Sequence, residues 1–325
     1  MAVWLEQTGL SWLRALEDET GFAESVLDGV AIRGVAPTAV TQSRLGYCWS
    51  HMAHLFPGEA EFARAAGKSF RLTSSQEPDH RVYDDSFYLL FMSWYFHLTG
   101  DPAATRRLRD RYAVIERHLD NAGVGGFGPQ PAGMRSHNPY MHLLEALLTI
   151  FRHTKDEYWL TRALSIEDLF FTRLLDKNTR LVFEFLNSDW SVAGDGRVEI
   201  GHQLEWPTLL LELHEITGKS KLRSTADRLC EFAMRHGFED GLAIDAVSSE
   251  GVPFDRRKLL WSQLEAARRF SGARATAHWE LVRERFFHPN GWSWYNRLTA
   301  EGAPVDEPSS ARLLYHVVTA GALVT

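Results

Sequence analysis

Hydrophobic residues are arranged along the chain in two alternating kinds of segment. One kind is apolar almost all round, as from Ser86 to Phe96, which is typical of a helix buried on several sides. The other alternates Arg and Asp pairs with one apolar stripe, as from Pro102 to His118, which is typical of a surface-facing helix. The pattern predicts about twelve helices, with the apolar ones near 41–56, 83–98, 140–152, 202–216, 258–271 and 308–322.

Short Gly-containing segments with an acidic residue separate several of these helices. Each is flanked by a few apolar residues, which is typical of a tight turn or a small β-hairpin. They occur at Asp28-Gly29, Asp195-Gly196, Glu250-Gly251 and Glu301-Gly302.

A second repeat lies within the apolar helices. The dipeptide Leu-Glu recurs at intervals of 60 residues, at Leu144-Glu145, Leu204-Glu205 and Leu264-Glu265. A repeat of this length indicates one helix pair per unit, and six such pairs fill the chain. The last segment, from Ala311 to Ala322, is as apolar as the others, whereas the end of an open solenoid needs a polar cap. We therefore expect one all-α domain over 1–325, an (α/α)6 barrel of six helix hairpins with short β-hairpins at one rim.

Composition and charge exclude several classes of protein. A net charge of −7 argues against an electrostatic nucleic-acid surface, and no stretch of 18 apolar residues offers a membrane span. The N-terminus lacks the basic and apolar regions of a signal peptide, and Cys48 and Cys230 are too few for a disulfide framework. We expect a cytoplasmic protein with reduced thiols, either a monomer or a homodimer.

The 14 His and 11 Trp residues suit a polar pocket walled by aromatic rings. In a toroid the inner helices begin at one rim, so side chains of their first turns converge on a central funnel. His142 with Glu145, and His202 with Glu205, are i, i+3 pairs in such turns, whereas His316 has no acidic residue at this spacing. Three histidines with an arginine, Arg44, on separate helices suit proton shuttling beside a developing oxyanion.

Other interpretations of these residues stay open. A histidine at a helix start also serves as a cap or a core residue, and the repeated Leu-Glu is also explained by packing. The two His-x-x-Glu pairs, or His51 with His54, offer ligand atoms, but no Cys is placed to complete a zinc site, so no metal or other cofactor is predicted. The tryptophans near the rim are candidates for stacking on a sugar ring, with core packing as the alternative: Trp49, Trp206, Trp261, Trp292 and Trp294.

Ordered motifs extend over nearly the whole chain. They are Gln42-Ser43-Arg44, Tyr83-Asp84-Asp85, Asn138-Pro139-Tyr140-Met141-His142, Gly201-His202-Gln203-Leu204-Glu205-Trp206, Leu260-Trp261-Ser262-Gln263-Leu264-Glu265 and Tyr315-His316. Together they resemble the N-acylglucosamine 2-epimerase superfamily, (α/α)6 barrels that act on free sugars. The third and fourth motifs are most similar to those of its aldose–ketose isomerases, which interconvert mannose and fructose.

The resemblance implies roles for individual residues. The acid/base and ring-opening histidines are implied to be His142, His202 and His316. Contacts to the sugar are implied for Arg44, Tyr83, Asn138 and Trp261. We expect Glu145 and Glu205 to orient, or to raise the basicity of, the histidines beside them. Arg312 has two interpretations, a salt bridge to Glu265 or Glu307, or a contact to an anionic group of the substrate.

The sequence thus predicts a metal-independent aldose–ketose isomerase for a monosaccharide such as D-mannose or D-fructose. In this hypothesis His202 and His316 transfer protons through a cis-enediolate that Arg44 stabilises, while His142 opens or orients the ring. A sugar 2-epimerase on the same scaffold is the alternative. A glycoside hydrolase or an inactive sugar-binding protein is a third possibility. The chain departs from its relatives in being shorter, and Asp85 stands where the familiar motif has His.

Overall fold

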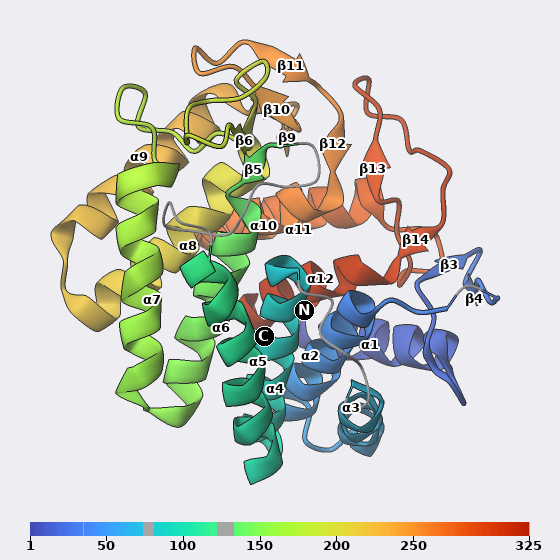
Figure 1. Ribbon diagram of the computed structural model, residues 1–325. Helices are drawn as coiled ribbons and strands as arrows, with labels where there is room; N and C mark the ends of the chain where they lie inside the picture. The colour runs from blue at the N-terminus through green and yellow to red at the C-terminus, as the bar shows by residue number, and fades with distance from the viewer. Residues whose placement is uncertain (35, 74–80, 122–132, 325) are drawn as a thin grey trace.

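The computed structural model describes residues 1–34, 36–73, 81–121 and 133–324, and within them the helices form two concentric layers (Figure 1). The inner ring consists of α2 (Ala39–Leu55), α4 (Val82–Thr99), α6 (Asn138–Thr154), α8 (Ile200–Thr217), α10 (Leu260–Arg269) and α12 (Leu314–Gly321). Each inner helix contacts the next, and α12 contacts α2, which closes the ring. The predicted (α/α)6 barrel is confirmed.

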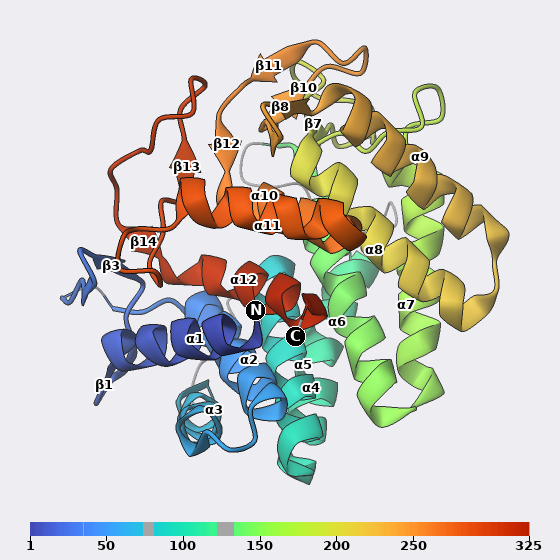
Figure 2. The same ribbon diagram turned by 180° about the vertical axis from the view of Figure 1, so that it is seen from behind.

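The outer layer consists of α1 (Ala2–Leu16), α3 (Ala60–Thr73), α5 (Pro102–Asn121), α7 (Glu157–Leu169), α9 (Ser220–His236) and α11 (Gly272–Phe286), with a π-helical turn at Phe170–Leu174. Seen from behind, α9 and α11 lie outside α8 and α10 (Figure 2). No helix in the described ranges is long and apolar enough to cross a membrane.

The predicted contrast between inner and outer helices has a direct structural cause. The inner helix α4 is buried at every position from Asp85 to Ser93, because it packs on both ring neighbours and on α5. The outer helix α3 buries Phe62, Ala66 and Phe70 at helical spacing, while Arg64 on its other face is exposed.

All strands are short, and each lies between the end of an outer helix and the start of an inner one. They therefore gather at the rim where the inner helices begin. The strands are β1 (Glu17–Asp18), β2 (Gly21–Phe22), β3 (Ser25–Leu27), β4 (Val30–Ala31), β5 (Arg135–Ser136), β6 (Phe185–Leu186), β7 (Val198–Glu199), β8 (Phe238–Glu239), β9 (Leu242–Ala243), β10 (Ala246–Val247), β11 (Pro253–Asp255), β12 (Lys258–Leu259), β13 (Arg297–Leu298) and β14 (Ser309–Ser310).

The rim hairpins confirm several of the predicted turns. Asp28 and Gly29 join β3 to β4 with φ of 51° and 79°, and the left-handed region they occupy matches the twist of a two-residue hairpin. Glu250-Gly251 joins β10 to β11. Strand β14 pairs with β3, so the last rim segment is joined to the first one.

Two predicted helix starts are wrong. The segment expected to be helical from 308 begins as β14, continues as a 3-10 turn over Ala311–Leu313 and becomes α-helical only at Leu314. Likewise Lys258–Leu259 is β12, paired with β13, and α10 begins at Leu260. In both places the backbone pairs with a neighbouring rim segment, and that tertiary pairing outweighs the local apolar pattern.

Three inner helices are fixed to the preceding rim segment by a glutamine, which we call a glutamine clamp. In each clamp the side-chain amide donates to a backbone carbonyl at 2.8 Å and accepts from the N–H of the same residue at 2.7–3.3 Å. The pairs are Gln42 with Phe22, Gln203 with Val182, and Gln263 with Ala243. The clamp reproduces the two hydrogen bonds of an antiparallel strand pair.

Candidate active site

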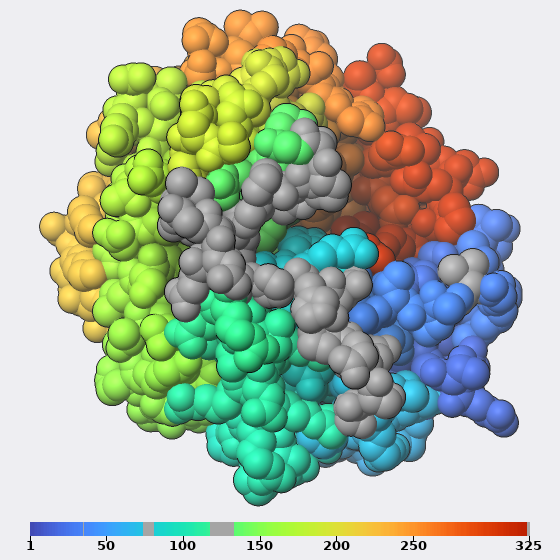
Figure 3. Space-filling view, viewed as in Figure 1, coloured from blue at the N-terminus to red at the C-terminus, as the bar shows by residue number. Residues whose placement is uncertain are grey.

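A cavity of about 250 Å³ lies at the rim where the inner helices begin. Figure 3 shows this face of the molecule, which is hollowed beside the red C-terminal segment. Most of the residues predicted from the sequence come together here, from all six inner helices or the segments just before them. The lining residues are Arg44, Tyr83, Asn138, His142, Glu184, Glu199, His202, Glu205, Trp261, Leu313 and His316.

Each of the three cavity histidines contacts a carboxylate through Nδ1. The distances are 3.2 Å for His142 to Glu145, 2.7 Å for His202 to Glu184 and 2.8 Å for His316 to Glu265. A carboxylate at Nδ1 fixes the orientation of the ring. It leaves Nε2 as the nitrogen available to a molecule in the cavity.

The three imidazoles differ in charge. Burial lowers the pKa of His316 and lowers the pKa of His142 to about 4, and one carboxylate each offsets only part of this. Burial acts on His202 in the same direction, but Glu184 and Glu199 outweigh it, so the pKa of His202 lies well above its usual range. At neutral pH the cavity therefore holds one imidazolium beside two neutral imidazoles, which supplies an acid and bases together.

The glutamates of the Leu-Glu repeat, Glu145, Glu205 and Glu265, lie around one buried cation, Arg268. Nη1 of Arg268 donates to Oε2 of Glu265 at 2.7 Å. Burial tends to raise the pKa of Glu265, but Arg268 and His316 hold it at about 2. Among the described residues no arginine or lysine forms an ion pair with Glu205, and burial together with the neighbouring Glu265 and Glu145 raises its pKa well above the usual range. Glu205 is therefore a neutral acid that lines the cavity and has a proton to donate.

The expected pairing of His202 with Glu205 is wrong. His202 Nδ1 turns toward Glu184 in the segment before β6, whereas the imidazoles near Glu205 are those of His142, at 3.9 Å, and His316. The expected pairing of His142 with Glu145 is confirmed, and the hydroxyl of Tyr315 also donates to Glu145. Glu145 thus supports the site from beneath and is not among the lining residues.

The expected salt bridge of Arg312 to Glu265 or Glu307 is wrong, and the contact to an anionic group of the substrate stays a prediction. Its Nε donates to Thr41 Oγ1 at 2.9 Å and lies 3.6 Å from Glu24, and the residue does not line the cavity. Glu265 and Glu307, the expected partners, pair with other arginines. The reason is local: Arg312 lies in the 3-10 turn before α12, which directs its side chain toward the start of α2.

Arg44 brings an unneutralised positive charge to the cavity. Its guanidinium lies 3.8 Å over the Phe87 ring, and it donates to Tyr83 Oη and, at 3.3 Å, to the carbonyl of Arg312. Among the ion pairs of the described residues none involves Arg44, although its exposed fraction is only 5%. A buried cation with neutral partners is suited to an anion that forms during a reaction.

The Trp261 ring lies between two of the histidines, 4.8 Å from the ring centre of His202 and 5.8 Å from that of His316. It lies against Gly201, where a Cβ atom would come within 2.3 Å of the indole. This contact explains the glycine of the Gly-His-Gln motif. The other four rim tryptophans do not line the cavity within the described residues, and Trp49, Trp206 and Trp294 are fully buried core residues.

Several site residues were not found from the sequence, namely His137, Glu184, Glu199, Arg268 and Tyr315. One signal points to Glu184. It comes two residues after Val182, the residue held by a glutamine clamp, and an acidic residue occupies the same offset in the other two clamps, as Glu24 and Asp245.

Groups of His and Glu side chains close enough to share a metal ion occur in this cavity, and one of them is His137 with Glu184 and His202. The indole N–H of Trp206 donates to His137 Nδ1 at 3.0 Å, so a neutral His137 carries its proton on Nε2, the nitrogen that faces Glu184 at 3.1 Å. A protonated nitrogen is not a ligand, and this arrangement suits hydrogen bonding rather than metal binding.

Known proteins share both the sequence pattern and the fold. A mannose-6-phosphate isomerase of Rhizobium meliloti (strain 1021) is 30% identical over 204 residues, 56% of this chain and 53% of that protein, so the match spans about half of its length. A D-mannose isomerase of Pseudomonas cannabina pv. alisalensis is 27% identical over 312 residues, 81% of this chain and 75% of the relative.

A crystal structure of a D-mannose isomerase superposes with a TM-score of 0.87 at 20% identity, covering 99% of this chain and 96% of that one, which shows a common fold. A sequence model of the N-acylglucosamine 2-epimerase (GlcNAc 2-epimerase) family matches residues 21–320, which include every cavity residue. The chain therefore belongs to the N-acylglucosamine 2-epimerase family.

Proposed function

We propose that the protein is an aldose–ketose isomerase of free monosaccharides such as D-mannose and D-fructose, and that it acts without a metal ion. The observation that carries the proposal is the pairing of an imidazolium, His202, with a neutral imidazole, His316, on either side of Trp261. Aldose–ketose isomerisation needs an acid and a base at adjacent carbons. The names of the mannose isomerase relatives support the same reaction class.

The lining charges favour an uncharged sugar. Arg44 is the only cationic arginine or lysine among the described lining residues, and it faces three glutamates there, Glu184, Glu199 and Glu205. The two cations of the lining, Arg44 and the His202 imidazolium, are matched by the side chains of Glu184 and Glu199, so the lining offers no surplus positive charge to an anionic substrate.

Ring opening comes first in the proposed mechanism. The neutral His142 takes the proton of the anomeric hydroxyl through Nε2, while the protonated carboxyl of Glu205 gives a proton to the ring oxygen as the bond from C1 to that oxygen breaks. Both transfers are reversed when the ketose ring closes: the ring-closing hydroxyl gives a proton back to Glu205, and His142 Nε2 gives its proton to the new anomeric oxygen.

Isomerisation follows on the open chain. His316 Nε2 removes the proton from C2, which the C1 carbonyl has acidified, and His202 protonates the oxygen on C1. Arg44 stabilises the negative charge of the cis-enediolate as it forms. His316 then returns its proton to C1 while His202 recovers one from the hydroxyl on C2, and the ketose is complete with both histidines restored.

A 2-epimerase is the second candidate, because imidazoles flank Trp261 on both sides. If the second imidazole protonates C2 from the face opposite to the first, the product is the epimeric aldose. The two reactions share the C2 proton abstraction and differ only in where the proton returns.

Mannose incubated with the protein in D₂O and EDTA tests both candidates. Carbon-bound deuterium and product are followed by NMR. We expect fructose to appear first, with deuterium at C1. Early accumulation of glucose with deuterium at C2 assigns the epimerase instead. If no common hexose gives ketose, epimer or deuterium exchange, the proposal is wrong, and release of reducing sugar from an oligosaccharide would indicate a hydrolase.

A further inference from the structure

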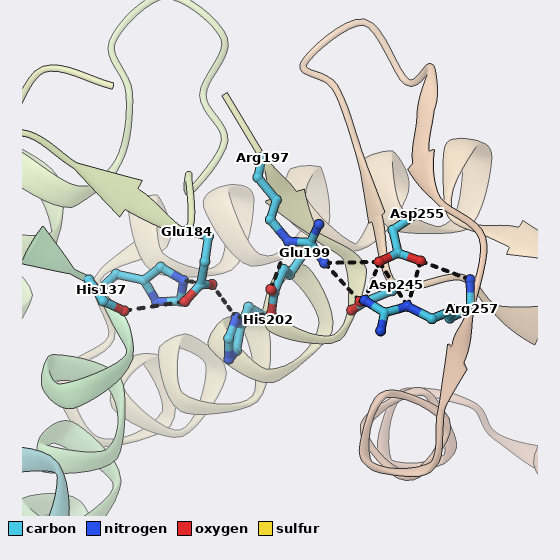
Figure 4. Close-up of polar contacts among 9 residues, drawn as sticks. His137, Glu184, Arg197, Glu199, His202, Asp245, Asp255 and Arg257 are labelled. Atoms are coloured by element: carbon cyan, nitrogen blue, oxygen red, sulfur yellow. Dashed lines mark hydrogen bonds and ion pairs between the residues drawn. The ribbon is translucent and has the colours of Figure 1, made fainter. Parts of the chain in front are cut away.

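Behind His202 lies a buried chain of hydrogen bonds that the proposed reaction steps do not use. It runs from the indole N–H of Trp206 to His137 Nδ1 (3.0 Å), from His137 Nε2 to Glu184 Oε2 (3.1 Å) and from that same oxygen to His202 Nδ1 (2.7 Å). The exposed fraction of the four residues lies between 0% and 6%. Figure 4 shows Glu184 between the two imidazoles.

The rim strands set this geometry. Strand β5 pairs with β6 in antiparallel register, with Ser136 opposite Phe185. The next residue on each side is therefore His137 on one and Glu184 on the other. Trp206 lies one helical turn after His202 on α8, so its indole is on the same side of that helix and reaches His137 from below.

The Trp206 contact decides the state of His137. An indole nitrogen only donates, so His137 Nδ1 must accept, and the proton of the neutral ring must be on Nε2. Burial also lowers the pKa of His137, in spite of the adjacent Glu184. His137 therefore donates to Glu184 as a neutral group and leaves the negative charge of the carboxylate uncompensated.

That charge is available to His202. Burial tends to raise the pKa of Glu184, but the two imidazoles outweigh it and keep the carboxylate ionised. The titratable groups facing His202 are Glu184, Glu199, His137 and Glu205. His137 is neutral and Glu205 is protonated, so the two remaining carboxylates are those that act on His202.

Glu199 differs from Glu184 in having a cation of its own. Its Oε2 lies 3.3 Å from His202 Nδ1, but its Oε1 accepts from Arg197 Nε at 2.9 Å. Arg197 continues to Asp245 at 2.7 Å, and this acidic residue also faces Arg257 (Figure 4). Glu199 is thus one end of a network that includes two arginines, Arg197 and Arg257, whereas the ion pairs of Glu184 among the described residues are with His137 and His202 alone.

We propose that Glu184 and His137 are positioning residues that hold His202 as an imidazolium, with Trp206 fixing the tautomer of His137. The inference rests on the proposed function, in which His202 is the acid. Neither residue touches the substrate through a reacting atom in that mechanism. Their effect is exerted entirely through the charge and orientation of the His202 ring.

The test uses ¹⁵N-histidine NMR of the full chain without substrate, with the His202 signals assigned from their loss in His202→Gln. Glu184→Gln is expected to move the titration midpoint of His202 to lower pH by more than one unit, and Glu199→Gln, the matched control, by less than half of that. In turnover, Glu184→Gln is expected to lower kcat about 10- to 100-fold with little change in KM, and to move the alkaline limb of kcat to lower pH.

Glu184→Asp, which keeps the charge, is expected to restore most of the midpoint. An unchanged His202 midpoint in Glu184→Gln, or an equal shift in Glu199→Gln, overturns the proposal. If Glu184→Gln does not fold, Trp206→Phe is the second test. In this variant the His137 nitrogens should lose their single-tautomer signals, and the titration midpoint of His202 should move to lower pH. Unchanged spectra would overturn the proposal. Because these spectra need no substrate, an inactive protein with the expected midpoints would contradict the proposed function alone.

Discussion

The inner helices carry histidines at both ends, and the two groups have different neighbours. In α6, His142 lies near the start and His153 in the last turn, so the helix separates them by about 16 Å. The cavity group comprises His142, His202 and His316. The other group, which we call the distal cluster, comprises His51 and His54 on α2, His97 on α4 and His153 on α6.

In the distal cluster the imidazoles contact rings and hydroxyls. His51 stacks on Trp94 at 3.9 Å, and His97 stacks on His153 at 4.2 Å. The Nδ1 partners are Tyr47 Oη for His51 and Ser93 Oγ for His153, at 2.9 and 3.0 Å. Burial, with the nearby imidazoles adding to it, lowers the pKa of both histidines to about 3.

The comparison shows that burial alone does not make a histidine chemically useful. His51 and His142 are both buried, and both belong to a spaced pair that the sequence singles out. What separates them is the group on Nδ1, a neutral hydroxyl for one and a carboxylate for the other. The carboxylate offsets part of the effect of burial, so the pKa of His142 is about 4 against about 3 for His51. At His202, where two carboxylates act, the pKa lies well above its usual range.

The largest difference between the two groups of histidines should appear in kcat/KM when one side chain of each group is replaced by alanine. His316→Ala removes the proposed base and is expected to lower kcat/KM about 10³-fold, in the range of general-base catalysis. His153→Ala, the matched distal variant, should stay within about twofold, because its ring has no path to the cavity. Steady-state kinetics on mannose measures both. Equal losses in the two variants would remove the distinction.

A second comparison is between two arginines of the same rim, Arg44 in the cavity and Arg312 outside it. Arg44→Gln is expected to lower kcat about 10²-fold, the loss typical of removing one oxyanion donor. Arg312→Gln is the control, because Arg312 lies on the same rim and is turned away from the cavity. A loss of about threefold or less is expected there. A larger effect of Arg312→Gln than of Arg44→Gln would contradict the placement of both arginines.

The pH dependence of kcat/KM tests the role of the Glu265 carboxylate at Nδ1 of His316. The base His316 has a lowered pKa, so the acid limb of kcat/KM should lie below about pH 6.5, the ordinary value for histidine. The acid His202 has a raised pKa, so the alkaline limb should lie above that value. Glu265 supports the protonated form of His316, so Glu265→Gln should move the acid limb to still lower pH, with a loss of about tenfold in kcat because the base is weaker. An acid limb that moves to higher pH would contradict this assignment.

The smallest effect concerns stability in acid. His51 is neutral in the folded protein, with a pKa of about 3 against about 6.5 when unfolded, so its contribution to stability is lost as pH falls below 6.5. Between pH 7 and pH 5 this costs about 1–2 kcal/mol. Urea unfolding of His51→Gln should show a smaller loss over that interval. The raised pKa of His202 acts with the opposite sign, so His202→Gln should not reduce the loss.

How much the sequence predicts depends on the range of the interaction. Helical periodicity and the Leu-Glu repeat are local, and they correctly indicated the barrel and the first turns that carry His142 and His202. The partner of His202 was missed because Glu184 lies in a rim segment, and its position depends on the pairing of β5 with β6. The salt bridge expected for Arg312 was wrong because the residue lies in a 3-10 turn directly after β14, and this turn changes the direction of its side chain.

The glutamine clamps have a consequence for how the barrel opens to solvent. Each clamp joins residues about twenty positions apart, so it belongs to one rim hairpin and its own inner helix and not to the ring as a whole. Protection of the Val182 amide against deuterium exchange therefore depends on one side chain, that of Gln203. The same segment carries Glu184, and there the backbone is also held by the pairing of β6 with β5.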